Sequence, residues 1–304
     1  MKNKFKIIAA FFGIYVIWGS TYLAIRFTLE TLPPLLTAGL RFFIAGLILY
    51  VFARFRMNEP KPNGSHWRSA AIIGGFLILG GNGNVVLAER SVPSGVAALI
   101  VATIPIWMVL LEWLWLRKRR PAPATWVGLV LGFGGVALLI VPDLLSKAAQ
   151  MRPAGFIGLL AAALLWAVGS LQARRLDLPS SGVLATGMQM TAGGAMLFAA
   201  GMMRGELSMF HPAGFSERSV AAFIYLVLFG SLWGFTAYIW LLKNVGAVKV
   251  STYAFVNPVV AILLGCFFAA EKISGHMICA AIMVVAAVGI ITFYKDRAAK
   301  QEAL

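Results

Sequence analysis

The feature that most constrains this chain is a succession of apolar runs, each about as long as a lipid bilayer is thick. A helix needs roughly 20 consecutive, mainly apolar residues to cross the hydrocarbon core. Ten stretches meet that requirement, at approximately 7–26, 35–53, 69–88, 92–115, 124–141, 155–173, 182–203, 219–242, 247–270 and 274–294. Helices satisfy all of their own backbone hydrogen bonds in lipid. The sequence therefore predicts an all-α membrane protein with ten transmembrane helices.

The composition agrees with this prediction. Of the 304 residues, 60% are hydrophobic and 12% are charged, whereas soluble domains average about 45–50% and about 25%. The net charge of +15 could suggest binding to nucleic acid, but the basic residues stand in short clusters between apolar runs. No basic reading helix with interleaved aromatic residues is present. The expected partners are therefore the lipid bilayer and a small-molecule substrate, and no nucleic acid.

The two cysteines, Cys266 and Cys279, lack the spacing of metal ligands, so we expect no metal and no other cofactor. The basic start of the chain, Met1 to Lys6, resembles the opening of a signal peptide. The apolar run after it has no small-residue cleavage site, so we interpret it as the first span.

The distribution of lysine and arginine predicts the orientation of the helices. With the N-terminus in the cytoplasm, the inner segments carry 18 of the 26 Lys and Arg residues, the outer segments carry 7, and Arg41 lies within a span. Cytoplasmic loops are enriched in Lys and Arg. Both termini are therefore expected in the cytoplasm.

Sparse internal matches indicate two related halves. At an offset of 148, Trp18, Gly39 and Gly46 match Trp166, Gly187 and Gly194. At an offset of 153, Gly81, Val92 and Pro105 match Gly234, Val245 and Pro258. Each half holds five spans, and an odd number reverses the second half relative to the first. The prediction is two inverted five-helix repeats, 1–148 and 149–304, an architecture of many secondary transporters with the substrate site between the repeats.

Two corresponding stretches, 91–119 and 244–272, each carry a proline inside a membrane-length run. Pro105 and Pro258 each remove one helix hydrogen bond, which lipid tolerates only where protein or a water-filled cavity takes up the freed group. Together with Gly19 in the first span, they are predicted to let helices bend as one gate closes and the other opens. The polar residues are concentrated in the second of these stretches, 244–272. Tyr253 and Asn257 are therefore predicted to form the wall of the site that selects the substrate.

The residues in this order resemble a known family. They are Trp18-Gly19-Ser20 before Arg26, Ala38-Gly39-Leu40-Arg41-Phe42, Pro105, Trp166, and Asn257-Pro258 followed by Glu271-Lys272. The set is similar to the drug/metabolite transporter superfamily, and within it to the EamA-like ten-span exporters. This resemblance implies a central cavity lined by spans 1, 3, 4, 6, 8 and 9, export of small metabolites, amino acids or drugs, and a bacterial-type inner (plasma) membrane. One departure is Leu116-Arg117-Lys118 at the end of the fourth span, where the family often has a glutamate.

Polar and aromatic residues within the spans are the candidates for a substrate pocket, because an amphipathic ligand suits aromatic walls with a few amides. They are Trp18, Ser20, Tyr22, Arg41, Asn82, Asn84, Trp107, Trp166, Trp233, Tyr238, Tyr253 and Asn257. A charge at the bilayer centre costs about 2.5–3.5 kcal/mol on insertion scales. Arg41 is therefore interpreted either as attracting an anionic substrate group or as pairing with helix carbonyls.

Carboxylates near span ends are interpreted structurally. Glu112 is expected to form an ion pair with Arg117, and Glu271 is expected to cap a helix or anchor a loop. No carboxylate was found at mid-depth in the predicted spans. The sequence therefore names no proton carrier, and both uniport and exchange stay open.

These observations predict a secondary transporter that exports small amphipathic metabolites, such as amino acids or drugs, by alternating access through a central cavity. An alternative is an organic-anion or sugar-phosphate exchanger, which would need a second cation facing the cavity beside Arg41, such as Lys243 or Lys249. An intramembrane enzyme is disfavoured because the histidines lie in loops or near an interface and no Gly-x-Ser-x-Gly pattern occurs. The protein is therefore not expected to be an enzyme.

Overall fold

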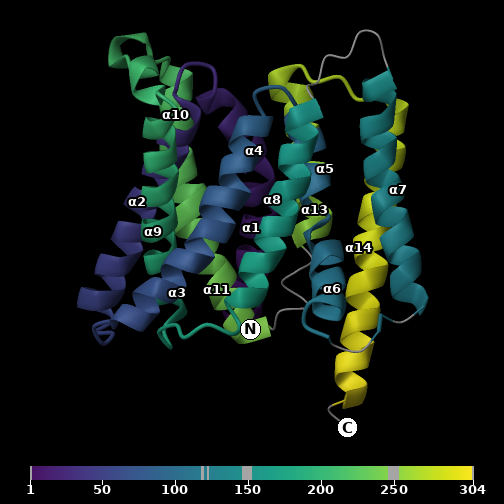
Figure 1. Ribbon diagram of the computed structural model, residues 1–304, viewed down its shortest axis with the longest axis horizontal. Helices are drawn as coiled ribbons and strands as arrows, with labels where there is room; N and C mark the ends of the chain where they lie inside the picture. Colours follow the sequence, from purple (N-terminus) through teal and green to yellow (C-terminus); the bar gives the residue numbers. More distant parts are fainter. Residues whose placement is uncertain (1, 118–119, 122, 146–152, 246–252, 303–304) are drawn as a thin grey trace.

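A computed structural model describes residues 2–117, 120–121, 123–145, 153–245 and 253–302. Within these ranges the regular structure is helical, and the long helices stand side by side in one bundle (Figure 1). In chain order the elements are α1 (Lys2–Thr28), α2 (Pro34–Val51), η1 (Phe52–Arg56), α3 (Gly64–Gly74), η2 (Gly75–Asn82), α4 (Gly83–Ala88), α5 (Ser94–Val101), α6 (Ile104–Leu114), α7 (Pro123–Leu145), α8 (Pro153–Gln172), α9 (Gly182–Met203), η3 (Glu206–Met209), η4 (Pro212–Gly214), α10 (Glu217–Tyr225), η5 (Leu226–Trp233), α11 (Gly234–Val245), α13 (Tyr253–Ala269) and α14 (Gly275–Glu302).

Seven helical stretches of the described chain are long and apolar enough to cross a membrane. They are Lys6–Thr28, Pro34–Arg56, Gly64–Ala88, Ser94–Leu114, Pro153–Gln172, Gly182–Met203 and Glu217–Tyr238. Three shorter apolar helices, Pro123–Leu138, Val256–Ala269 and Gly275–Ile291, overlap the remaining three predicted spans. The chain is thus a multi-pass membrane protein whose described regular structure is helical, and each predicted span overlaps at least one described helix.

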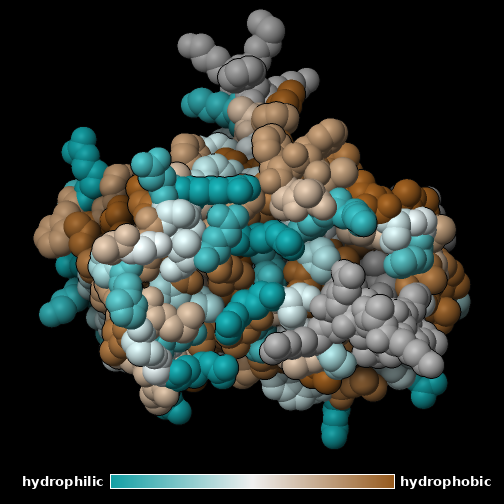
Figure 2. Space-filling model, turned by 90° about the horizontal axis from the view of Figure 1, so that it is seen from above, coloured by the Kyte–Doolittle hydropathy of each residue, from teal (hydrophilic) through white to brown (hydrophobic). Residues whose placement is uncertain are grey.

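The exterior of the bundle matches a lipid environment. Viewed along the bundle, hydrophilic side chains gather over the end face, whereas hydrophobic side chains surround its rim (Figure 2). The helix α1 begins and α14 ends at the same end of the bundle, at the bottom of Figure 1. We call this end the terminal face and the other end the opposite face.

Three of the spanning stretches are interrupted rather than uniformly α-helical. The segments η2 and η5 are π-helical and lie in the middle of the third and eighth predicted spans. The fourth span is broken at Ala102 and Thr103, and Pro105 lies in the first turn of α6, where its missing N–H is not needed. Pro258 by contrast lies inside α13. The expectation that each proline removes a hydrogen bond inside a helix is therefore corrected for Pro105, which follows a break, whereas Pro258 lies within a helix.

The closest helix contact joins the antiparallel helices α2 and α9, whose glycines face each other. Cβ atoms added to Gly39 and Gly46 of α2 would overlap the backbones of Phe198 and Thr191 in α9. Cβ atoms added to Gly187 and Gly194 of α9 would overlap the backbones of Tyr50 and Phe43 in α2. Small residues at such positions let membrane helices approach until their backbones touch.

These contacts are reciprocal. Gly39 meets residue 198, and the residues that correspond to them at an offset of 148, Gly187 and residue 50, also meet each other. The contacts of Gly46 and Gly194 are related in the same way. Reciprocity of this kind is the signature of a two-fold axis, in which residue i meets j and j meets i. The axis here relates two segments of one chain.

We expect the substitution Gly194→Ala to destabilise the protein. The added methyl group would meet backbone atoms of Phe43 and Gly39, which cannot rotate away, and overpacking of this kind costs about 1–3 kcal/mol. Gly64→Ala, at a helical position with open space around it, is the control. The measurement is thermal unfolding of the purified protein in detergent, and equal midpoints for the two variants would contradict the close contact.

Candidate functional site

A cavity of about 560 Å³ lies inside the bundle and reaches the terminal face. It is walled by α1, η2, α5, α6, α8, α9, α11 and α13, and its volume is within the range of small-molecule sites, about 300–1,000 Å³. Arg174, which follows α8, lines it with a side chain that is 57% exposed. The cavity therefore opens to solvent at the terminal face.

A deeper chamber of about 100 Å³ continues from this cavity. Both spaces are lined by Trp18, Tyr22, Val101, Ile104, Trp166, Phe235, Tyr253 and Asn257. The deeper chamber adds Thr21, Arg41, Phe42, Asn82 and Gly230. We call the two together the central cavity. The lining helices include those of spans 1, 3, 4, 6, 8 and 9, as the resemblance implies. The helices α2 and α9 line the cavity in addition.

One side of the central cavity is an aromatic cluster centred on Trp18. Its ring centroid lies 5.5 Å from that of Phe235, 5.2 Å from that of Tyr238 and 5.0 Å from that of Tyr253. The Trp18 indole N–H donates to the carbonyl oxygen of Gly230 in η5 at 3.2 Å. Edge-to-face packing and this hydrogen bond hold the rings in place, so the cluster is a preformed apolar wall.

Asn257 connects this wall to the first helix. With its amide nitrogen facing two carbonyl oxygens, it donates to the Tyr253 oxygen at 3.1 Å and to the Tyr15 oxygen at 3.2 Å. The second bond joins α13 to α1 one residue before Pro258. Asn257 therefore has a structural role in addition to its position on the cavity surface.

Asn82 is the last residue of the π-helical segment η2. Its amide donates to the Leu77 oxygen five residues earlier, at 3.2 Å, and its side chain lines the deep chamber. Such π-helical segments frequently occur at functional sites. Here the wide turn brings Gly81 against Trp166, which places that indole across from the Trp18 cluster.

Arg41 is the cation at the deep end of the cavity. It is 5% exposed, its Nε–H donates to the Ser231 hydroxyl at 2.9 Å, and its guanidinium lies 4.6 Å from the centroid of the Phe42 ring. The hydrogen bond links α2 to η5. The guanidinium also lines the chamber, so it can present a positive charge to an anionic group there.

The structure brings most of the predicted pocket residues together. The eight that line the central cavity are Trp18, Tyr22, Arg41, Asn82, Trp166, Tyr238, Tyr253 and Asn257, and Pro105 and Pro258 line it as well. Ser20, Asn84, Trp107 and Trp233 are not among the lining residues. Gly19 is not among them either and packs against Val260 of α13.

Each of the four predicted residues that do not line the cavity lies elsewhere in the bundle. The Ser20 hydroxyl pairs with the Tyr225 hydroxyl at 2.6 Å, and Asn84 faces a groove between α4 and α8. Trp107 packs edge-on against Phe133 of α7, and Trp233 is 40% exposed beside Gly13. Helical periodicity explains two of these placements. Ser20 and Asn84 each follow a lining residue by two positions, which is about 200° around a helix.

Five polar lining residues lie outside the predicted set. Thr21 lies on α1, Ser170 on α8, and Thr186 and Gln189 on α9, and Arg174 follows α8 in a segment expected to be a cytoplasmic loop. Arg174 also approaches Glu112, whose carboxylate lies 3.9 Å from its guanidinium. Arg117 was the expected partner of Glu112, and the structure shows Arg174 near this carboxylate. No sequence signal distinguishes Arg174 from the adjacent Arg175, because both follow α8 in a short polar segment.

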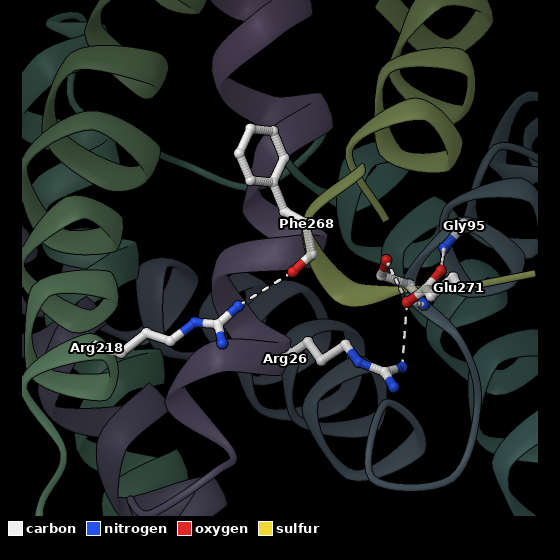
Figure 3. Close-up of polar contacts among 6 residues, drawn as sticks. Arg26, Gly95, Arg218, Phe268 and Glu271 are labelled. Carbon is white, nitrogen blue, oxygen red and sulfur yellow. Dashed lines mark hydrogen bonds and ion pairs between the residues drawn. The ribbon is translucent and has the colours of Figure 1, made fainter. Parts of the chain in front are cut away.

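At the opposite face, Glu271 closes the bundle. Its carboxylate accepts hydrogen bonds from the Ser94 N–H at 2.9 Å, the Ser94 hydroxyl at 2.8 Å and the Gly95 N–H at 3.3 Å. It also pairs with Arg26 of α1 at 3.1 Å (Figure 3). The predicted capping role of Glu271 is confirmed, because the donors are the free N–H groups at the start of α5.

A second arginine strengthens this closure. Arg218, at the start of α10, donates to the Phe268 carbonyl oxygen at 3.2 Å (Figure 3). Its guanidinium also lies 3.5 Å from the centroid of the Phe27 ring. The chain after α13 is thereby held between α1, α5 and α10. Within the described part of the chain, the central cavity is thus open at the terminal face and shut at the opposite face.

Among the described residues, no group of three or more His, Cys, Asp and Glu side chains is arranged to hold a metal ion. Apolar spanning helices around an internal cavity define a polytopic membrane protein. The chain belongs to the EamA-like transporter family, whose model matches residues 5–141 and again 153–293. It is therefore a membrane transporter of the drug/metabolite transporter superfamily.

Its relatives agree with this assignment. The chain is 38% identical to the inner membrane transporter YedA of Escherichia coli K12, over 97% of this chain and 93% of the relative. It is 27% identical to the protein PecM of Dickeya dadantii, over 90% of this chain and 88% of that one. A crystal structure at 21% identity shares the fold with a TM-score of 0.63, over 96% of this chain and 98% of the other. The family and its names indicate a transporter rather than an enzyme.

We expect the Arg26–Glu271 pair to be energetically asymmetric. Glu271→Gln removes the charge that the Ser94 and Gly95 donors face, and charge-assisted hydrogen bonds contribute about 1.5–3 kcal/mol. Arg26→Ala removes a side chain that is 38% exposed, and pairs of that kind contribute about 0–1 kcal/mol. Denaturant unfolding of both variants in detergent is the measurement. A larger loss for Arg26→Ala would contradict the capping interpretation.

Proposed function

We propose that this protein is a secondary transporter that exports small amphipathic metabolites, such as amino acids, by alternating access through the central cavity. The observation that carries the proposal is the combination in one preformed cavity of an aromatic wall and a deep cation. The Trp18 cluster would pack against an apolar side chain, and Arg41 would attract a carboxylate. A substrate with both features satisfies both ends of the site.

The proposed architecture is two inverted five-helix repeats, 1–148 and 149–304, forming ten spans. Its support is the double match of the family model, the reciprocal glycine contacts of α2 and α9, and the π-helical segments in the third and eighth spans. We place the terminal face in the cytoplasm because the loops there carry most of the lysine and arginine. The name of YedA supports a bacterial inner membrane.

In this orientation the structure corresponds to a state open to the cytoplasm. Export then requires two changes: closure of the terminal face around Arg174, and release of Glu271 from Ser94 and Arg26. Pro258 inside α13 and the break before Pro105 are the sites where the backbone is least constrained by helix hydrogen bonds. Gly19 allows α1 to approach α13 closely. These positions remain the proposed hinges.

A second candidate, an organic-anion exchanger, is favoured by one specific observation. That function needs a second cation facing the cavity, and Arg174 lines its mouth while Arg41 lines its deep end. The two lysines considered from the sequence do not contribute to this argument, because the Lys243 side chain and Lys249 lie outside the described residues. The candidates differ in whether the substrate needs an apolar group.

A counterflow screen of the purified protein in liposomes distinguishes these functions. Amino acids, nucleobases, sugars, sugar phosphates, aliphatic carboxylates and cationic drugs are each tested at two pH values. We expect saturable exchange of solutes that combine an apolar group with a carboxylate, such as phenylalanine. Exchange of sugar phosphates alone would select the anion exchanger, and ohmic conductance without saturation would indicate a channel.

Substitution of Arg41 tests its assigned role. Arg41→Gln removes one charge-assisted interaction of about 1.5–3 kcal/mol, so the apparent affinity for a carboxylated solute should fall roughly ten- to a hundred-fold. Arg56→Gln makes the same change in charge at an exposed position of η1 and serves as the control. Counterflow of labelled phenylalanine measures both. An unchanged affinity in Arg41→Gln would assign this residue to packing alone.

A further inference from the structure

Glu89 is the one described carboxylate that is buried without any hydrogen-bond partner in the described chain. It follows the last residue of α4 and is 4% exposed, and neither carboxylate oxygen accepts a hydrogen bond from a described residue. The other buried acids at this face are satisfied: Glu206 accepts from the N–H groups of Leu35 and Leu36, and Glu271 accepts from α5. Native proteins rarely leave such a group without a purpose.

The position of Glu89 places it between two spaces. Asn82 and Val85, seven and four residues earlier on nearly the same helix face, line the central cavity. Glu89 itself lines a groove of about 470 Å³ on the opposite face, together with Arg26, Leu29, Glu30, Arg90, Ser91, Val92 and Pro93. We call this the opposite-face groove. Glu89 therefore borders the groove, while its two carboxylate oxygens stay almost fully covered.

The ionisable groups around Glu89 come from three other elements. Tyr22 and Arg26 face it from α1, Arg41 from α2, and Glu271 from the segment after α13; Glu30 and Arg90 line the same groove. The two cations that interact electrostatically with Glu89 have other partners: Arg26 pairs with Glu271, and the Nε–H of Arg41 donates to Ser231. An ionised carboxylate would therefore be buried without a direct partner, which is costly, whereas a neutral acid is not.

We propose that Glu89 is a proton-binding site and that its protonation holds the opposite-face gate shut. The gate is the contact of Glu271 with Arg26, Ser94 and Gly95, and its assignment as a gate rests on the proposed transport function. A proton from water in the opposite-face groove binds one carboxylate oxygen and forms one O–H bond, and no other bond changes. The neutral side chain is then compatible with the closed arrangement.

When the opposite-face gate opens, the ionised form of Glu89 is favoured instead of the neutral form. When Glu271 leaves Arg26, the freed guanidinium and entering water can both stabilise ionised Glu89, which lies in the same groove as Arg26. Protonation therefore favours the closed gate and ionisation the open gate, because a ligand shifts an equilibrium towards the state that binds it more tightly. As pH rises through the titration of Glu89, the proton is lost and the gate should open more often.

Infrared spectroscopy tests the proton site directly, without any transported solute. Purified protein in membranes should show a carbonyl stretching band of a protonated carboxylic acid that disappears as pH is raised. Glu89→Gln should lack this titrating band, and Glu206→Gln, which alters another buried acid at the same face, should retain it. A band that persists unchanged in Glu89→Gln would overturn the proposal.

Cysteine labelling tests the link to the gate. In a background with Cys266→Ser and Cys279→Ser, a cysteine at Val92, which is buried and lines the groove, is labelled in detergent with a hydrophilic maleimide. The exposed variant Ala213→Cys corrects for the pH dependence of thiol reactivity. Corrected labelling should rise with pH when Glu89 is present, stay low in Glu89→Gln, and be high at every pH in Glu271→Gln.

Two outcomes would overturn the gate assignment: the same rise with pH in Glu89→Gln, or no rise when Glu89 is present. If Glu89→Gln does not fold, Glu89→Asp is used to test the gate assignment instead. A shifted pH midpoint of labelling in this variant supports the assignment, and an unshifted midpoint refutes it. Failure of every solute in the counterflow screen would refute the proposed substrate class while leaving these measurements interpretable. The two proposals therefore fail separately.

Discussion

The close contact of α2 with α9 is the constraint on which the rest of the structure depends. Glycines on both helices bring the two backbones together with almost no side chain between them, so the pair forms a rigid axis through the bundle. The contacts are reciprocal under the sequence offset of 148, so each half supplies the same surface to the axis. Arg41 on α2 and Gln189 on α9 are thereby held beside the central cavity, on elements that are fixed relative to each other.

Charge then distinguishes the two ends of the bundle. At the opposite face, Glu271 joins α1 and α5 through buried charge-assisted hydrogen bonds. At the terminal face, Glu112 and Arg174 approach to 3.9 Å with an exposed arginine, an arrangement worth far less in water. The buried contacts of Glu271 therefore hold the opposite face closed.

Hydropathy was sufficient to place the helices, because an apolar run of membrane length has few alternatives to a helix in lipid. It did not determine which side of each helix faces the cavity. Trp18, Thr21, Tyr22 and Ile25 all line it and share one face by their spacing of three and four, whereas Ser20 points elsewhere. The same reasoning applied to Asn82 and Val85 would have found Glu89. Trp107 and Trp233 could not be placed in this way, because their surroundings depend on how α7 and α1 pack in three dimensions.

The π-helical segments were also beyond prediction from hydropathy, yet they explain how polar groups enter an apolar bundle. In a regular helix every carbonyl is engaged within the helix, so a cavity wall would offer only side chains. In η5 the Gly230 carbonyl accepts the Trp18 indole N–H, and the adjacent Ser231 hydroxyl accepts from Arg41. In η2 the amide of Asn82 takes up the Leu77 carbonyl. Irregular backbone survives in lipid only where protein or a cavity satisfies it, and these hydrogen bonds of Trp18, Arg41 and Asn82 lie at the two π-helical segments beside the central cavity.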